Sequence, residues 1–171
     1  MEVERLAALA VAAIAVATDV RTRRIPNLLT FGGALVALAY WGWSGGLRGL
    51  GHGASGWAVG VALFLPLFVV GGMGAGDVKL LGAIGAWMGP GGTLYTALYS
   101  VLAGGVLALA VALRHHYLSR AFRNLWALVG FWRVTGVKPM PGLTLDDAAG
   151  PKLPYGIAIG VGTVIAILLG K

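Results

Sequence analysis

The sequence predicts an all-α integral membrane protein, a bundle of about six transmembrane helices that forms a single membrane-embedded domain over residues 1–171. Hydrophobic residues make up 58% of the chain and charged residues only 11%, whereas roughly one quarter of a soluble domain is charged. The mean hydropathy is +0.83. The 29 glycines also suit helices packed in lipid, because small side chains let helix backbones approach closely.

The first three spans are marked by apolar runs near twenty residues in length. The first, about 3–19, has acidic residues before it and basic residues after it. This is the reverse of a secretory signal peptide, so we expect a helix of the mature protein. A short loop separates it from the second span, about 27–43. The third, about 55–72, is expected to begin at Ser55, whose hydroxyl can cap the free amides of a helix start.

Three further spans complete the predicted bundle. The fourth, about 77–90, begins at Asp77, which we expect at an N-cap. The fifth, about 92–113, follows after a short loop. The chain then leaves the apolar pattern, and an amphipathic or partly soluble cytoplasmic insertion is expected at about 114–152. The sixth span lies at about 154–170.

Lysine and arginine set the predicted orientation, because cytoplasmic loops of membrane proteins are enriched in both residues. An even number of spans puts the N- and C-termini on one side, which carries three basic residues and is therefore extracytoplasmic. Ten lie on the other, cytoplasmic side: Arg21, Arg23, Arg24, Lys79, Arg114, Arg120, Arg123, Arg133, Lys138 and Lys152. The net charge of +7 is then mainly a topology signal that also favours anionic lipid. It gives nucleic-acid binding little support.

Two aspartates interrupt the apolar sequence at one depth of the predicted bundle. The first span runs toward the cytoplasm and ends at Asp19, and the fourth runs away from it and begins at Asp77, so both carboxylates are expected at the cytoplasmic edge. The apolar stretches beside them, 6–18 and 80–88, are shorter than the roughly twenty residues that a bilayer needs. Each aspartate is therefore drawn into the membrane, where a carboxylate marks a functional site. A structural ion pair with neighbouring basic residues is the alternative for either aspartate alone.

A pair of neighbouring carboxylates suits aspartic hydrolysis. The helix macrodipole disfavours negative charge where a helix ends and favours it where a helix begins, so Asp19 is expected to hold a shared proton and Asp77 to be ionised. The ionised carboxylate takes a proton from water as it attacks a peptide carbonyl, and the protonated one donates to the carbonyl oxygen. This chemistry needs no metal and no cofactor. The glycines of residues 71–76 are expected to leave the backbone uncovered for an extended substrate.

The chain resembles the GxGD intramembrane aspartic proteases at residues 74–77, which read GAGD. Three longer stretches resemble type IV prepilin peptidases. Residues 18–27 read TDVRTRRIPN and resemble the first catalytic aspartate with its basic residues and Ile-Pro-Asn turn. Residues 76–89 read GDVKLLGAIGAWMG and continue the second-aspartate motif. Residues 152–163 read KLPYGIAIGVGT and resemble the Pro-aromatic-Gly start of the last helix.

The resemblance is strongest to the short prepilin peptidases of tight-adherence (Flp-type) pilus systems, and it leaves only residues 114–150 without a counterpart. It implies that Asp19 and Asp77 are the catalytic pair and that Gly74 and Gly76 are the motif glycines. The implied partners are type IV pilin-like precursors, which carry a short basic leader ending in glycine. They would be cut after that glycine at the cytoplasmic face of the inner membrane.

Prepilins of this family commonly carry a glutamate just past the cleavage site, so Arg23, Arg24 or Lys79 could bind it in a charge-assisted contact. Contact of these side chains with lipid head groups is the alternative. Longer relatives also carry a cytoplasmic domain with paired CxxC motifs and N-methylate the new terminus. This chain has no cysteine and no room for that domain, which argues against methyltransferase activity. The sequence indicates no particular oligomeric state.

Parts of the sequence also fit three other functions. A small transporter or channel component would use the two aspartates to relay protons or bind a cation, but the halves show no inverted repeat and both acids lie at one edge, away from the midplane. A noncatalytic scaffold of a pilus assembly machine stays open. Residues 52–56 read HGASG and resemble the GxSG string of rhomboid serine proteases. That chemistry needs a histidine base near Ser55, and His115 and His116 are expected at the opposite membrane face.

Overall fold

The computed structural model describes residues 3–115, 118–144 and 154–170. Within these ranges the chain forms five helices and no strand, which confirms the all-α prediction. The helices are α1 (Val3–Thr22), α2 (Asn27–Val69), α3 (Ala75–Arg114), α4 (Leu118–Thr135) and α5 (Tyr155–Leu169). Among the described helices, α2 and α3 are long and apolar enough to cross a membrane, and α5 is a shorter apolar helix.

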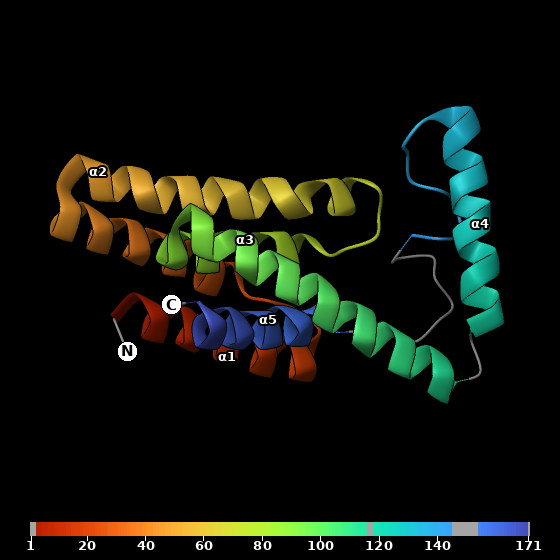
Figure 1. Cartoon of the computed structure of the whole chain (residues 1–171), viewed down its shortest axis with the longest axis horizontal. Coiled ribbons are helices and arrows are strands. Elements are labelled where there is room, and N and C mark those ends of the chain that lie inside the picture. Colours follow the sequence, from red (N-terminus) through yellow and green to blue (C-terminus); the bar gives the residue numbers. More distant parts are fainter. Residues whose placement is uncertain (1–2, 116–117, 145–153, 171) are drawn as a thin grey trace.

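The two longest helices each reverse direction at one glycine. Gly46 in α2 has φ 58° and ψ −143°, and Gly89 in α3 has φ 68° and ψ 177°, followed by Pro90. Glycine adopts such angles at little cost because it has no Cβ. Figure 1 shows that α2 and α3 fold back on themselves at these points. Their halves overlap four of the expected spans.

The reversal at Gly46 also corrects the predicted start of the third span. A loop was expected before Ser55, but the second half of α2 already resumes after Gly46. Ser55 therefore lies inside a helix, and its hydroxyl donates a hydrogen bond of 2.9 Å to the carbonyl oxygen of His52. The prediction was wrong because the glycine-rich stretch before Ser55 breaks the apolar run without breaking the helix.

The first half of α3 forms the centre of the bundle. Five of its side chains are fully buried: Leu80, Leu81, Ala83, Ile84 and Ala86. It packs closely against the second half of α2, where a Cβ at Gly60 would lie 2.6 Å from the carbonyl oxygen of Leu81. Because no side chain separates the two backbones here, the start of α3 is held firmly in place.

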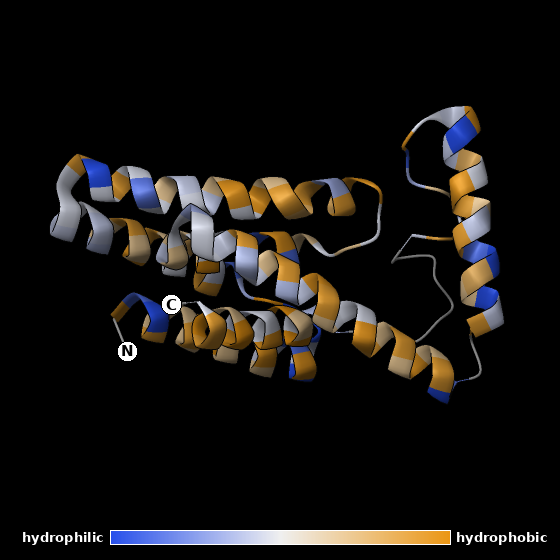
Figure 2. Cartoon of the chain, viewed as in Figure 1, coloured by the Kyte–Doolittle hydropathy of each residue, from blue (hydrophilic) through white to orange (hydrophobic). Residues whose placement is uncertain are grey.

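The last helix, α5, packs against both α1 and α3. On the α3 side, a Cβ at Gly162 would lie 2.7 Å from the Cα of Ser100. Figure 1 shows α5 beside α1, so that the start of α5, the end of α1 and the start of α3 lie at the same end of the bundle. In Figure 2 the helices of the bundle are mostly apolar, whereas strongly polar residues gather near helix ends and on α4.

Helix α4 stands apart from the bundle. Among the described helices it meets only α3, and none of its residues is buried. Figure 1 shows that it runs across the direction of the bundle helices, at the end where α3 begins. It lies within the insertion expected at about 114–152, of which residues 116–117 and 145–153 are outside the described residues. The residues left undescribed include Lys152 and the acidic pair Asp146 and Asp147.

Candidate active site

Asp19 is a buried carboxylate in the last turn of α1, with 8% of its surface exposed. The helix continues past it only to Thr22, and Arg23 then takes a positive φ of 54°. The amide of Arg23 donates a hydrogen bond of 2.9 Å to the carbonyl oxygen of Asp19, which closes the last turn. The sequence prediction that a helix ends around Asp19 is therefore accurate to within one turn.

Asp77 lies in the first turn of α3, but it is not the N-cap that the sequence predicts. That position belongs to Gly74, whose extended backbone (φ −76°, ψ 146°) precedes the helix. The amide of Asp77 donates a hydrogen bond of 3.1 Å to the carbonyl oxygen of Gly74, and the Asp77 carboxylate is in turn hydrogen-bonded by the Gly74 backbone. The second contact is one half of a capping box, in which the side chain at the third helical position accepts a hydrogen bond from the N-cap amide. It fixes the Asp77 side chain over the start of its own helix.

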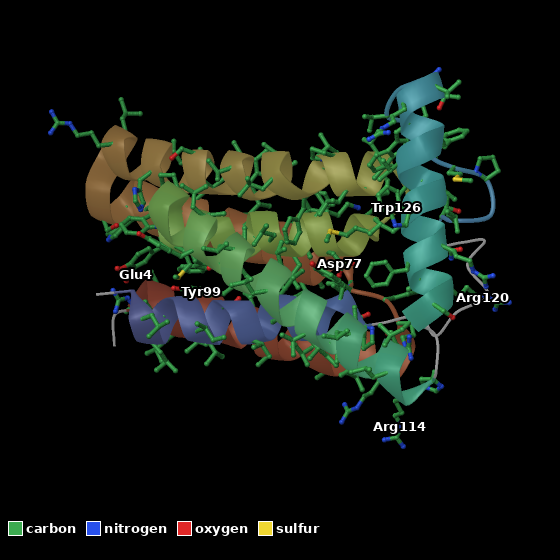
Figure 3. The ribbon with its side chains drawn as sticks, turned by 45° about the vertical axis from the view of Figure 1, so that its right-hand side comes forward. Glu4, Asp77, Tyr99, Arg114, Arg120 and Trp126 are labelled. Carbon is green, nitrogen blue, oxygen red and sulfur yellow. The ribbon has the colours of Figure 1, made fainter. Side chains whose placement is uncertain are left out.

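The structure brings the two aspartates together. Asp19 and Asp77 lie close enough for their charges to interact, and Asp77 interacts in the same way with Tyr155 at the start of α5. Figure 3 shows Asp77 in the interior of the molecule, at the end of the bundle that α4 faces. Two carboxylates whose charges interact resist being ionised together, so one protonated and one ionised group is the favoured state, as general acid–base chemistry needs.

The start of α5 supplies a contact that sequence reasoning did not assign. The amide of Gly156 donates a hydrogen bond of 3.0 Å to Asp19 Oδ2. A side chain at this position would collide with the carboxylate, because a Cβ at Gly156 would lie 2.8 Å from Asp19 Oδ2. The Pro-Tyr-Gly sequence of residues 154–156 is the feature from which this contact could have been predicted. Proline is typical of a helix start, and glycine leaves the backbone open to close approach by another group.

This contact changes the electrostatic picture of Asp19. The prediction that Asp19 holds the shared proton considered only α1, whose end disfavours negative charge. Gly156 places the start of a second helix beside the same carboxylate, and free amides at a helix start favour negative charge. Each aspartate is therefore hydrogen-bonded at the start of a helix, Asp77 by α3 and Asp19 by α5. Which of them holds the proton stays a prediction.

The glycines before Asp77 are less open than the sequence suggests. Gly71 adopts a φ of +77°, and a Cβ there would lie 2.9 Å from the Thr144 methyl group, so the segment after α4 covers this residue. A Cβ at Gly76 would lie 3.4 Å from the Cβ of Ile25, and a Cβ at Gly74 would lie 3.1 Å from Asp77 Oδ2. Glycine at Gly71 is thus explained by backbone conformation and at Gly74 by proximity to the carboxylate.

The three basic residues proposed to bind substrate differ in their surroundings. Arg23 and Arg24 are exposed and lie in the turn that follows Asp19. Lys79 Nζ donates a hydrogen bond of 3.0 Å to Asn27 Oδ1 and lies 5.3 Å from the centre of the Phe31 ring. These contacts tie the first turns of α3 to the start of α2.

The described residues give little support to a metal centre or to a serine nucleophile. Among them, no group of three or more His, Cys, Asp and Glu side chains is arranged to hold a metal ion. The His52 ring packs against Trp41, with ring centres 4.8 Å apart, and Ser55 bonds to the backbone of His52 and not to its imidazole. Of the histidine pair near α4, His116 is outside the described residues.

Comparison with known proteins identifies a family for this arrangement. The profile of a family described as the type IV leader peptidase family matches residues 6–109. The matched region contains both aspartates, the glycines between α2 and α3 and the basic residues after α1. The search of curated proteins and the search of solved structures found no match.

Proposed function

The chain belongs to the type IV leader peptidase family, and from this premise we propose that it is a membrane aspartic endopeptidase with Asp19 and Asp77 as its catalytic pair. Its substrates would be type IV pilin-like precursors, cut after the glycine that ends a short basic leader. The observation that carries the proposal is the buried position of Asp19 beside Asp77, each held by an amide at a helix start. The family match does not favour the alternative of an ion- or proton-coupled transporter.

The proposed reaction uses one ionised and one protonated carboxylate. The ionised carboxylate removes a proton from water as the water oxygen adds to the peptide carbonyl carbon, and the other carboxyl donates its proton to the carbonyl oxygen. The tetrahedral intermediate then collapses: the carboxyl that took the water proton passes it to the amide nitrogen, the other carboxylate takes back a proton from a hydroxyl of the intermediate, and the C–N bond breaks to give the carboxylic acid and the amine. Gly156 and Gly74 hold the two side chains in place, so that little reorganisation is needed when charge develops.

We propose that six helical segments cross the inner membrane: α1, both halves of α2, both halves of α3, and α5. The length and apolar composition of α2 and α3 support this topology, as do their reversals at Gly46 and Gly89. Both termini would then be extracytoplasmic. The pair would face the cytoplasm, because the basic residues of α4 and of the turn after α1 lie at the same end as Asp77.

For the substrate contacts, Arg23 and Arg24 are the better supported candidates. Both are exposed in the turn after Asp19, where a glutamate just beyond the cleaved bond could reach a guanidinium group. Lys79 is a weaker candidate, because its side chain is only partly exposed.

The test is cleavage of a pilin-like precursor by purified full-length protein in lipid vesicles with a chelator present. Wild type is expected to cut after glycine, and Asp19→Asn and Asp77→Asn are each expected to lose cleavage while keeping the wild-type Tm. Glu4→Gln is the matched control. It makes the same acid-to-amide change at the other end of the molecule, where Glu4 accepts a hydrogen bond of 3.3 Å from Tyr40. Normal cleavage by either aspartate variant would overturn the proposal.

A further inference from the structure

Helix α4 has an apolar face that none of the other described helices covers. Four of its large apolar side chains are strongly exposed: Val134 in the last turn, and nearer the middle Phe122 at 62%, Leu125 at 56% and Trp126 at 68%. An α-helix turns about 100° per residue, so the three nearer the middle share one face with Leu118 and Val129. In a globular protein such a face would be buried against a core.

The opposite face of α4 is polar and basic. Arg120, Arg123, Asn124 and Ala127 lie on it by the same helical spacing. In the last turn the pattern weakens, because Arg133 lies on the apolar side and Val134 on the polar side. Residues 114–144 contain five basic residues and no acidic residue. Helix α4 therefore has the two features of a helix that lies in a membrane interface, an apolar face and a cationic face. With three arginines in 18 residues, it is not among the helices apolar enough to cross a membrane.

The orientation of α4 fits this position. It runs across the direction of the bundle helices (Figure 1), so if those helices cross the bilayer, α4 lies parallel to the bilayer surface. Figure 3 shows Trp126 on the side of α4 that faces the bundle, and Arg120 on the side that faces away. The apolar face is thus turned toward the depth of the membrane and the basic face toward the cytoplasm.

We propose that α4 is an interfacial helix that docks on anionic phospholipids of the cytoplasmic leaflet, beside the catalytic pair. Its apolar face inserts among the acyl chains, and its arginines bind the phosphate groups. The choice of an anionic bilayer over another protein rests on charge: the segment is uniformly basic, as is the leader of the expected precursors, and two copies of it would repel each other. This inference rests on the membrane orientation proposed above.

The absence of cysteine makes a direct test possible. Leu125→Cys and Ala127→Cys place a nitroxide spin label on opposite faces of α4, two residues apart. The full-length variants are placed in vesicles of phosphatidylcholine, with and without phosphatidylglycerol. Accessibility of each label to oxygen and to a water-soluble nickel chelate is then measured. In anionic vesicles we expect the label at Leu125 to be open to oxygen and shielded from the chelate, and the label at Ala127 to be open to the chelate.

The contribution of charge is measured by adding Arg123→Gln and Arg133→Gln to the Leu125→Cys variant. Both arginines are exposed, and each basic residue near an anionic surface raises the ratio of docked to undocked helix by roughly fivefold. The double change should lower that ratio by roughly 25-fold in anionic vesicles and have little effect in phosphatidylcholine alone.

Several outcomes would overturn the proposal. Equal exposure of both labels to the chelate would mean that α4 is not in the interface. If the label at Leu125 is shielded equally in vesicles with and without phosphatidylglycerol, α4 does not recognise anionic lipid. Shielding accompanied by dipolar coupling between labels would mean that a second copy of the chain covers this face, and shielding seen only when precursor is present would mean that the substrate covers it. Cleavage is assayed in the same vesicles, so that the interfacial helix and the catalytic pair are tested independently. Cleavage by a protein whose α4 lies in water would refute only the interfacial helix. Loss of cleavage by a protein whose α4 is docked would refute only the catalytic pair.

Discussion

Replacing Gly156 with alanine tests whether the start of α5 holds Asp19 in its reactive position. The added Cβ would lie 2.8 Å from Asp19 Oδ2 and 3.1 Å from Asp19 Cβ, whereas ordinary contacts begin near 3.4 Å. The carboxylate or the helix therefore has to retreat by about 0.6 Å to reach an ordinary contact. Such a movement lengthens the 3.0 Å hydrogen bond between the Gly156 amide and Oδ2 beyond useful range.

The expected loss follows from the strength of that hydrogen bond. A hydrogen bond to a charged group is worth about 1.5–3 kcal/mol, which corresponds to a decrease of roughly 10- to 150-fold in rate if the bond acts on the transition state. The loss should fall on kcat and leave KM nearly unchanged, because Gly156 acts on Asp19, which we propose to be catalytic.

The assay is steady-state cleavage of a pilin-like precursor in vesicles, with Tm measured on the same preparations. The matched control is Gly105→Ala in α3, where an added Cβ meets no atom within 4 Å. We expect the control to retain wild-type kcat and Tm, and Gly156→Ala to lower Tm as well as kcat while staying folded at the assay temperature, because it loses a buried hydrogen bond. If Gly156→Ala cleaves at the wild-type rate, Asp19 does not depend on α5 and the reasoning is refuted.

Four further predictions follow from the site and the fold. A pair of carboxylates that shares one proton should give a bell-shaped pH profile of kcat/KM, and a profile with a single ionisation would argue against the pair. Gly46→Ala should destabilise the protein by about 1–3 kcal/mol in thermal unfolding, because Gly46 has φ 58° and ψ −143°, whereas Gly45→Ala, which meets no atom within 4 Å, should not. Lys79→Met should change stability by less than about 1 kcal/mol and leave kcat intact, since Lys79 contacts Asn27 and Phe31; a large loss of kcat would place it in the reaction. Ser55→Ala should cleave normally, and an inactive variant would reopen a serine mechanism.

That the two aspartates lie at the same end of the bundle could be predicted from the sequence, but their contacts could not. Alternating helix directions put Asp19 and Asp77 at one end of the bundle, and the structure has them close together there. The hydrogen bond from Gly156 escaped prediction because it joins residues far apart in the chain. Periodicity and hydropathy describe one helix at a time, so they say nothing about which helix start meets which side chain.

The predicted helix boundaries were wrong where some glycines turn the chain and neighbouring glycines continue the helix. Near residues 44–54 the glycines looked like a loop, yet only Gly46 turns the chain and the others continue the helix. Before Asp77 the glycines also looked like a loop, and the helix starts one turn earlier than predicted because Gly74 takes the N-cap position. A single glycine in a left-handed conformation reverses a helix within one residue, and hydropathy cannot distinguish it from its neighbours.

The contact between Gly71 and Thr144 has a consequence for selectivity. The Thr144 methyl group lies against the backbone of Gly71, in the loop that precedes Asp77, so a precursor that enters there must either accommodate this neighbour or displace it. The free energy of displacement is subtracted from precursor binding, and by thermodynamic linkage a bound precursor loosens the polypeptide around Thr144 to the same extent. A residue outside the bundle helices would thereby favour precursors that leave the contact at Gly71 intact over bulkier ones that must displace it.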